Sequence, residues 1–190
     1  MPYQPLLNYF NQYVEFDAQE IDLLTSKLKY RKYLKGQYMV QQGDVCRYNS
    51  FVVKGCTKTF YLDEDGQEHI IMFSVENWWS TDLGSFISQS PAAYNIQCIE
   101  NTEVIQLTYE DEEDITLAIP KVDRAFRKVL EKALVASQER LVRNFSITAL
   151  QRYQYFREQY PQLEQRIPLY MIASYLGITK EFLSKIRNQK

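Results

Sequence analysis

The sequence contains few residues of the kinds that bind metals. Its 190 residues include one histidine and three cysteines. Cys46, Cys56 and Cys98 are widely spaced and form no C-x-x-C pair, so we expect neither a zinc nor an iron–sulfur site. We interpret them as buried or partly buried thiols in a reducing compartment. His69, just after a predicted hairpin, is more typical of a surface strand residue than of a haem ligand.

Long hydrophobic runs are also absent. Apolar stretches reach only a few residues, as in 70–73, whereas a membrane-spanning helix needs about 18 or more. Residues 1–5 show neither the basic opening nor the apolar stretch of a signal peptide. A content of 45% hydrophobic and 24% charged residues is typical of a folded protein. The sequence therefore predicts a cytoplasmic protein with no membrane partner.

Charge is divided unevenly along the chain. The net charge is −2, but residues 1–120 carry 8 basic and 18 acidic side chains, whereas residues 121–190 carry 14 basic and 6 acidic ones. A basic C-terminal part behind an acidic N-terminal part suggests two modules, one of which could face nucleic acid. A solvated basic helix surface would give the same charge distribution.

The N-terminal part changes from a helical to a β-rich pattern. Residues 6–34 look helical, with a capping pair at Asp17 and Glu20. Short β-rich runs follow, and Asp65-Gly66 fits the positive φ values of a tight hairpin. These runs predict a small barrel or jelly roll. The expected strands are 38–41, 50–54, 57–62, 69–74, 94–99 and 103–107.

Helical patterns return after this region. Residues 109–119 are helix-like, and Pro120 fits the first turn of a longer helix. In residues 121–145 apolar side chains recur at steps of three and four and form one stripe. The stripe could pack on the same chain's barrel or on a twin helix from a second chain. Residues 146–160 look helical, and residues 161–168 look turn-like.

The most informative motif lies at the C-terminal end. Residues 169–187 have the pattern of helix, glycine turn and helix, in which Gly177 suits a left-handed C-cap and Thr179 an N-cap. Ala173 is small where the second helix passes closest. The positions that two crossing helices must bury are apolar, namely Ile172, Leu176, Ile178, Leu183 and Ile186. This spacing matches the DNA-binding helix-turn-helix, with an αα-hairpin that only completes the core as the alternative.

The polar residues of the second helix favour the DNA-binding interpretation. They can contact base edges and phosphates in a major groove, which a purely structural hairpin does not require. The predicted DNA-binding residues are Thr179, Lys180, Glu181, Ser184, Lys185 and Arg187, with Lys190 beyond them.

Over nearly its whole length the chain resembles the Crp/Fnr family of bacterial transcription regulators, in particular its short members of Bacteroidetes type. The resemblance rests on Gly43-Asp44, the segment 51–55, the segment 65–68 and the helix-turn-helix. It implies an α+β fold in three parts. These are a jelly-roll-like, cyclic-nucleotide-binding-like β-roll with flanking helices in residues 1–120, a long dimerisation helix in 121–145, and an all-α helix-turn-helix domain in 146–190.

The resemblance also implies a function and partners. The chain would be a homodimer that binds a palindromic operator in double-stranded DNA, with RNA polymerase as a further partner. Lys180, Glu181 and Lys185 match the family's base-contacting positions, and lysine lacks the bidentate fork of arginine, so the operator preference would differ. With little chain after Arg187, we expect contact mostly through the helix rather than a wing. One histidine and no phosphate-binding glycine loop argue against an enzyme and against a cofactor.

The effector site departs from the family pattern. Cyclic AMP binders of the family hold the phosphate with a Gly-Glu pair and, about ten residues later, an arginine pair. Here the arginine position falls on Ala92, and no arginine lies between Arg47 and Arg124. We predict no tight cyclic AMP binding and leave an unidentified small-molecule effector open. The candidate effector contacts are Ser80, Thr81, Asp82 and Tyr94, unless Trp78, Trp79 and Phe86 fill the cavity. A β-roll sensor that no longer binds DNA is the second functional hypothesis.

Overall fold

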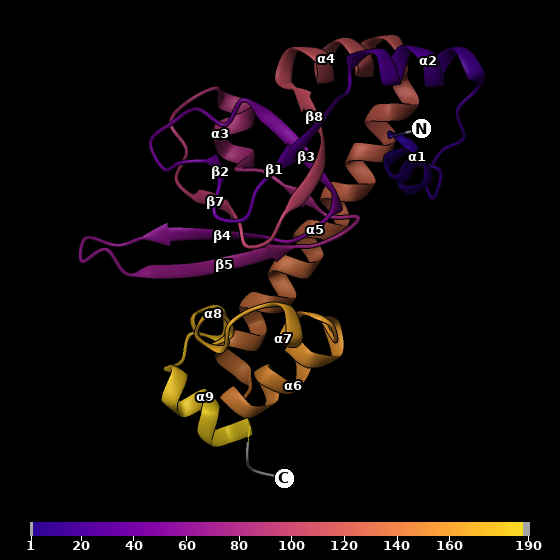
Figure 1. The fold of residues 1–190 in the computed structure, drawn as a ribbon. Helices are drawn as coiled ribbons and strands as arrows, with labels where there is room; N and C mark the ends of the chain where they lie inside the picture. The colour runs from indigo at the N-terminus through magenta and orange to yellow at the C-terminus, as the bar shows by residue number, and fades with distance from the viewer. Residues whose placement is uncertain (1, 188–190) are drawn as a thin grey trace.

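The computed structural model describes residues 2–187 and shows an α+β fold. A β-roll with flanking helices leads into one long helix, which leads into a helical C-terminal part (Figure 1). The helices of the roll part are α1 (Gln4–Phe10), α2 (Ala18–Lys27), α3 (Leu83–Ser88) and α4 (Tyr109–Ala118). The later helices are α5 (Pro120–Ser146), α6 (Ala149–Gln159), α7 (Leu163–Arg166), α8 (Leu169–Leu176) and α9 (Lys180–Arg187).

Two antiparallel sheets build the roll. Their strand orders are β1-β8-β3-β6 and β2-β7-β4-β5. The strands are β1 (Lys29–Tyr33), β2 (Tyr38–Val40), β3 (Tyr48–Lys54), β4 (Thr57–Leu62), β5 (Glu68–Ser74), β6 (Trp79–Ser80), β7 (Asn95–Cys98) and β8 (Thr102–Thr108). Phe51 pairs with Ile105 on the face that α1, α2, α4 and α5 cover. Their neighbours Val52 and Val104 lie on the opposite, inner face, as the period of two requires.

The structure confirms the six predicted strands with small shifts at their ends and corrects the helical interpretation of residues 6–34. That segment forms α1, α2 and strand β1, which pairs along its whole length with β8. The predicted capping box of Asp17 and Glu20 is present at the start of α2. Residues 161–168, expected as a turn, contain the short helix α7.

The β4–β5 hairpin is also present as predicted. Only Gly66 of the predicted Asp65-Gly66 pair has a positive φ, at 78°. The turn is longer than a two-residue hairpin loop, because the Asp63 N–H donates to the Gln67 carbonyl across it. No helix within residues 2–187 is long and apolar enough to cross a membrane.

The long helix α5 is covered along only part of its length. Val122, Ala125 and Phe126 are buried in the cluster formed with the roll and its helices. The apolar side chains beyond them are largely uncovered in the single chain, namely Leu130, Leu134, Val135, Leu141, Val142 and Phe145. The chain's own core therefore covers the first turns of the stripe and leaves the rest open.

The C-terminal helices pack directly on the β4–β5 hairpin (Figure 1). One apolar cluster includes Phe60 and Ile70 of the hairpin together with Phe156, Ile172 and Leu183 of the helices. The hydroxyl of Ser174 in α8 accepts from the Ile70 N–H at 3.0 Å and donates to the Glu68 carbonyl at 2.9 Å. The hairpin and the helices thus share one hydrophobic core.

A charged bridge supports this contact. The Arg166 guanidinium of α7 pairs with Glu76 at 3.0 Å and with Glu100 at 2.7 Å, both in the roll part. Burial raises the pKa of Glu76, but hydrogen bonds from Arg166 and from the Gly55 N–H outweigh burial and leave this pKa below its ordinary value. Because the pKa of Glu76 is lower in the folded state, ionised Glu76 stabilises the fold at pH values above its ordinary pKa. This stabilisation is lost as the pH falls through the lowered pKa.

We expect Arg166→Ala to destabilise the protein by about 1–2 kcal/mol near pH 7, because two partly buried carboxylates lose their partner. The difference from wild type should shrink as the pH falls through the lowered pKa of Glu76, because the protonated carboxyl no longer pairs with Arg166. Urea unfolding across this pH range measures both effects. Arg157→Ala is the matched control, since Arg157 pairs with Glu164 within the C-terminal part. Equal losses in the two variants would contradict the bridging role of Arg166.

Candidate functional site

The helix-turn-helix forms as the sequence predicts. Helix α8 ends at Gly177, whose φ of 67° is left-handed, and the Ile178 N–H closes the turn on the Ala173 carbonyl at 3.0 Å. The Thr179 hydroxyl accepts from the Phe182 N–H at 3.1 Å and caps α9. Ala173 is buried at the crossing of the two helices. Helix α9 is thereby fixed at a defined angle to α8.

The apolar side chains of the helix-turn-helix face the protein core. Ile172, Leu176, Leu183 and Ile186 are all less than 5% exposed, and Ile178 is half-buried. The charged side of α9 therefore faces outward, as required of a helix that enters a groove.

The structure brings most of the predicted contact residues to that outward side. Lys180, Glu181 and Lys185 are exposed, and Ser184 is half-buried. Positions 180, 181, 184 and 185 fall on one side of a helix with 3.6 residues per turn. Thr179 serves the turn as its cap, and Arg187 pairs with Glu164 of α7 at 3.3 Å. Lys190 lies outside the described residues.

Three basic side chains of the C-terminal part contact other groups of the same chain, which the sequence did not indicate. Arg140 of α5 and Arg152 of α6 donate to the Tyr175 and Leu176 carbonyls at 3.3 and 3.4 Å. They cap the C-terminal end of α8, where cations are favoured. Arg143 stacks on the Tyr155 ring at 3.8 Å. Arg140 links α5 to α8, Arg152 links α6 to α8, and Arg143 links α5 to α6, so all three are engaged within the chain.

The predicted effector site contains an internal carboxylate. Asp82, only 4% exposed, caps α3 by accepting from the Ser85 N–H at 3.1 Å. Its other oxygen accepts from the N–H groups of Ala93 and Tyr94 at 2.9 and 3.1 Å. We call these three N–H groups the cradle. The Asp82 carboxylate therefore satisfies all three donors from within the chain.

The remaining predicted effector residues are engaged differently. Ser80 is buried and hydrogen-bonded to the Thr57 hydroxyl at 2.8 Å. The Thr81 hydroxyl donates to Asn49 at 2.7 Å. The Tyr94 side chain is partly exposed at the surface. The Ser80 and Thr81 hydroxyls are therefore satisfied by the chain itself, and contact of Ser80, Thr81 or Tyr94 with an effector stays a prediction.

The alternative that Trp78, Trp79 and Phe86 fill the roll cavity is wrong for the two tryptophans, whereas Phe86 is buried. Trp79 packs on the helix-covered face, against Phe10 and Phe126. Trp78 is 39% exposed and lies against the Tyr160 ring of the C-terminal part. A strand of two residues between turns gives little pattern from which to predict the side that each ring faces.

The cysteines and the histidine behave as expected from the sequence. All three cysteines are free and buried, and burial raises the pKa of Cys56 to about 12 and that of Cys98 to about 11, so both remain thiols. His69 lies on the exposed end of the β4–β5 hairpin and contacts the Asp63 carboxylate at 2.6 Å. Within residues 2–187, His, Cys, Asp and Glu form no group of three or more that could hold a metal ion.

Comparison with known proteins relates the chain to transcription regulators over most of its length. A model of the cyclic nucleotide-binding domain matches residues 30–117, from β1 to α4. Transcriptional activator protein Anr of Pseudomonas protegens is 22% identical over 185 residues, which cover 91% of this chain and 75% of Anr. The fumarate and nitrate reduction regulatory protein of Vibrio cholerae is 24% identical over 184 residues, which cover 90% and 72%.

The fold agrees with these relatives. The structure of FixK2 from Bradyrhizobium japonicum superposes with a TM-score of 0.75 at 18% identity and covers 85% of this chain and 83% of FixK2. The structure of the regulator CLP from Xanthomonas campestris has a TM-score of 0.73 at 15% identity and covers 91% of each chain. The domain match, the relatives and the fold together support a transcriptional regulator of the Crp/Fnr type.

Proposed function

We propose that this chain is a sequence-specific DNA-binding transcription regulator that acts as a homodimer on a palindromic operator. The observation that carries the proposal is the outward side of α9, where Lys180, Glu181, Ser184 and Lys185 lie together on a buried apolar base. Two copies of α9 in successive major grooves would lie about 34 Å apart. In this arrangement Lys180, Glu181 and Lys185 contact bases, and Thr179, Ser184 and Arg187 position the helix on phosphates.

The uncovered part of α5 supports the homodimer. Leu130, Leu134, Leu141 and Phe145 are separated by four, seven and four residues, which places them on one side of the helix. An uncovered apolar side of this length fits a twin helix from a second copy. We assign the β-roll to residues 1–120, the dimerisation helix to 121–145 and the DNA-binding domain to 146–190.

The cradle supports a regulator that does not bind cyclic AMP tightly. Its three N–H donors are satisfied by Asp82, and buried Ala92 supplies no cation. A cyclic phosphate would meet the Asp82 carboxylate and would need a counter-charge that the cradle lacks. RNA polymerase is the proposed protein partner, the cytoplasm is the proposed site of action, and we propose no catalytic role and no cofactor.

Selection from randomised duplex DNA at two salt concentrations tests the proposal. We expect a palindromic consensus whose binding weakens steeply with salt, because phosphate contacts release counterions. Lys185→Ala should weaken binding to that consensus about tenfold, since one base or phosphate contact is lost, and Glu181→Ala should relax the preference at one base pair.

Lys35→Ala is the matched control, because it removes the same charge from an exposed position in the roll. Its binding should equal that of wild type. A purified dimer that retains no DNA even at low salt would instead establish the alternative, a β-roll sensor or interaction protein whose hairpin no longer binds DNA.

A further inference from the structure

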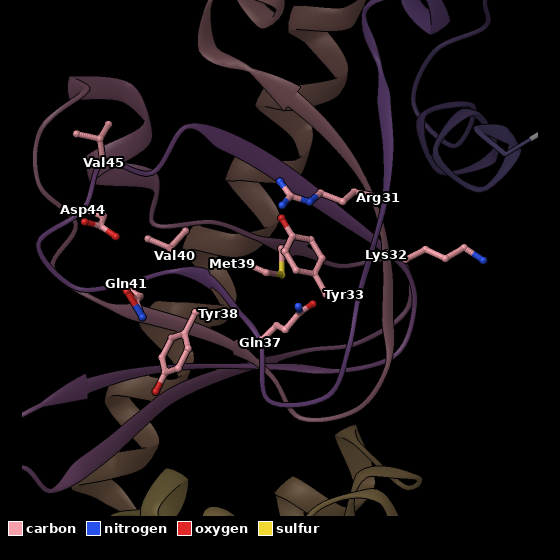
Figure 2. A pocket seen from close by; sticks show the side chains of 10 residues that line it. All are labelled: Arg31, Lys32, Tyr33, Gln37, Tyr38, Met39, Val40, Gln41, Asp44 and Val45. Carbon is pink, nitrogen blue, oxygen red and sulfur yellow. The ribbon is translucent and has the colours of Figure 1, made fainter.

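An open cavity lies at the mouth of the β-roll, beside β1 and β2 (Figure 2). Its volume of about 560 Å³ is within the range of small-molecule sites. Met39, Val40 and Val45 supply an apolar wall. The residues that line this cavity are different from the residues that form the cradle, whose donors are the N–H groups of residues 85, 93 and 94.

One cation lies on the cavity side of β1. Arg31 pairs with Val104 and shares the inner side of the sheet with Tyr33, two residues on. Its guanidinium lies 4.7 Å from the centre of the Tyr33 ring. Among residues 2–187 no carboxylate forms an ion pair with Arg31. The next residue, Lys32, also lines the cavity, but its side chain points away from Arg31 and Tyr33 in Figure 2 and pairs with Glu103 at 3.4 Å.

A second donor lies beside Arg31. The Tyr33 hydroxyl accepts from the Gln106 amide at 3.2 Å, and the same amide donates to Ser50 at 3.0 Å. The Tyr33 proton is therefore left to donate, and no hydrogen bond uses it within the described part of the chain. Burial raises the pKa of Tyr33, so the hydroxyl keeps its proton at neutral pH. Two donors of the kind that bind anions thus lie at one end of the cavity.

We propose that this cavity binds a small organic anion with an apolar body. The anionic group contacts the Arg31 guanidinium and the Tyr33 hydroxyl, and the body packs on Met39, Val40 and Val45. Figure 2 shows Asp44 at the opposite end from Arg31, which favours a ligand with a hydrogen-bond donor on its far end. The site requires only the roll, so it stands whether or not the protein binds DNA.

Fluorescence titration with 8-anilino-1-naphthalenesulfonate, an aromatic sulfonate with one N–H group, tests the site without DNA. We expect saturable one-site binding to the wild-type protein and about tenfold weaker binding to Arg31→Gln, because a charge-assisted contact is lost. Lys54→Gln is the matched control, since it removes the same charge from an exposed position of the roll that does not line the cavity. Its affinity should stay within about twofold of wild type.

Tyr33→Phe gives a second measurement that does not depend on the arginine variant. Removing the hydroxyl alone should weaken binding severalfold, whereas Tyr61→Phe, at an exposed tyrosine of β4, should not. Thermal unfolding in the absence of probe verifies that each variant is folded. Equal weakening in Arg31→Gln and Lys54→Gln, or no saturable binding to the wild-type protein, overturns the proposal.

Discussion

Glutamate at both Leu134 and Leu141 should convert the protein into a monomer that no longer holds its operator. Both side chains are more than half exposed in the single chain, so the substitutions leave the fold intact. In the proposed dimer they would place four carboxylates in an apolar interface, where desolvation and like charge oppose association. Losing the second recognition helix should weaken operator binding by about 100-fold or more.

Sedimentation equilibrium and fluorescence anisotropy with the selected operator measure the two effects. Leu117→Glu is the matched control, because Leu117 is an exposed leucine of α4 with 80% of its surface accessible. It should leave both the mass and the affinity unchanged. A double variant that remains dimeric would show that α5 is not the association surface.

Asp82→Ala should lower the free energy of unfolding by about 3 kcal/mol or more. The alanine leaves the buried N–H group of Ser85 and the partly buried N–H groups of Ala93 and Tyr94 without an acceptor, and each such loss costs about 1–3 kcal/mol before relaxation or water entry. Asp82→Asn keeps one amide oxygen in the cradle and should fall between alanine and wild type. Urea unfolding gives the values directly.

The control for this prediction is Asp44→Ala, which removes an exposed carboxylate from the loop beside the cradle. We expect a change within about 0.5 kcal/mol for it. If Asp82→Ala changed the free energy of unfolding as little as Asp44→Ala, the three hydrogen bonds would contribute little to stability. The interpretation of Asp82 as an internal anion would then fail.

Sequence reasoning succeeded where the signal was local. The helix-turn-helix was predictable because Gly177, Thr179 and the buried positions around them lie within one short segment. Strand β1 was missed because the apolar spacing of residues 6–34 also fits a helix, and its partner β8 lies more than 60 residues away. The hairpin between β4 and β5 again combined adjacent strands with a glycine turn.

The candidate sites were predictable to different degrees. The exposed side of α9 follows from helix periodicity alone. The role of Asp82 depends on Ala93 and Tyr94, eleven and twelve residues later, which only the folded roll brings to its carboxylate. Arg31 was missed as a cation for the roll, because it precedes the segment that corresponds to the family's phosphate site. Contacts between distant segments decide both cases.

The internal carboxylate has a consequence for how the roll can be regulated. A ligand that is part of the chain has a fixed effective concentration, so the cradle stays filled at every metabolite level in the cell. A free anion would have to displace a tethered competitor, and its apparent affinity would be its intrinsic affinity multiplied by the fraction of time that Asp82 is detached. A free anion is therefore at a disadvantage at the cradle, which favours a chemical signal that enters the roll elsewhere.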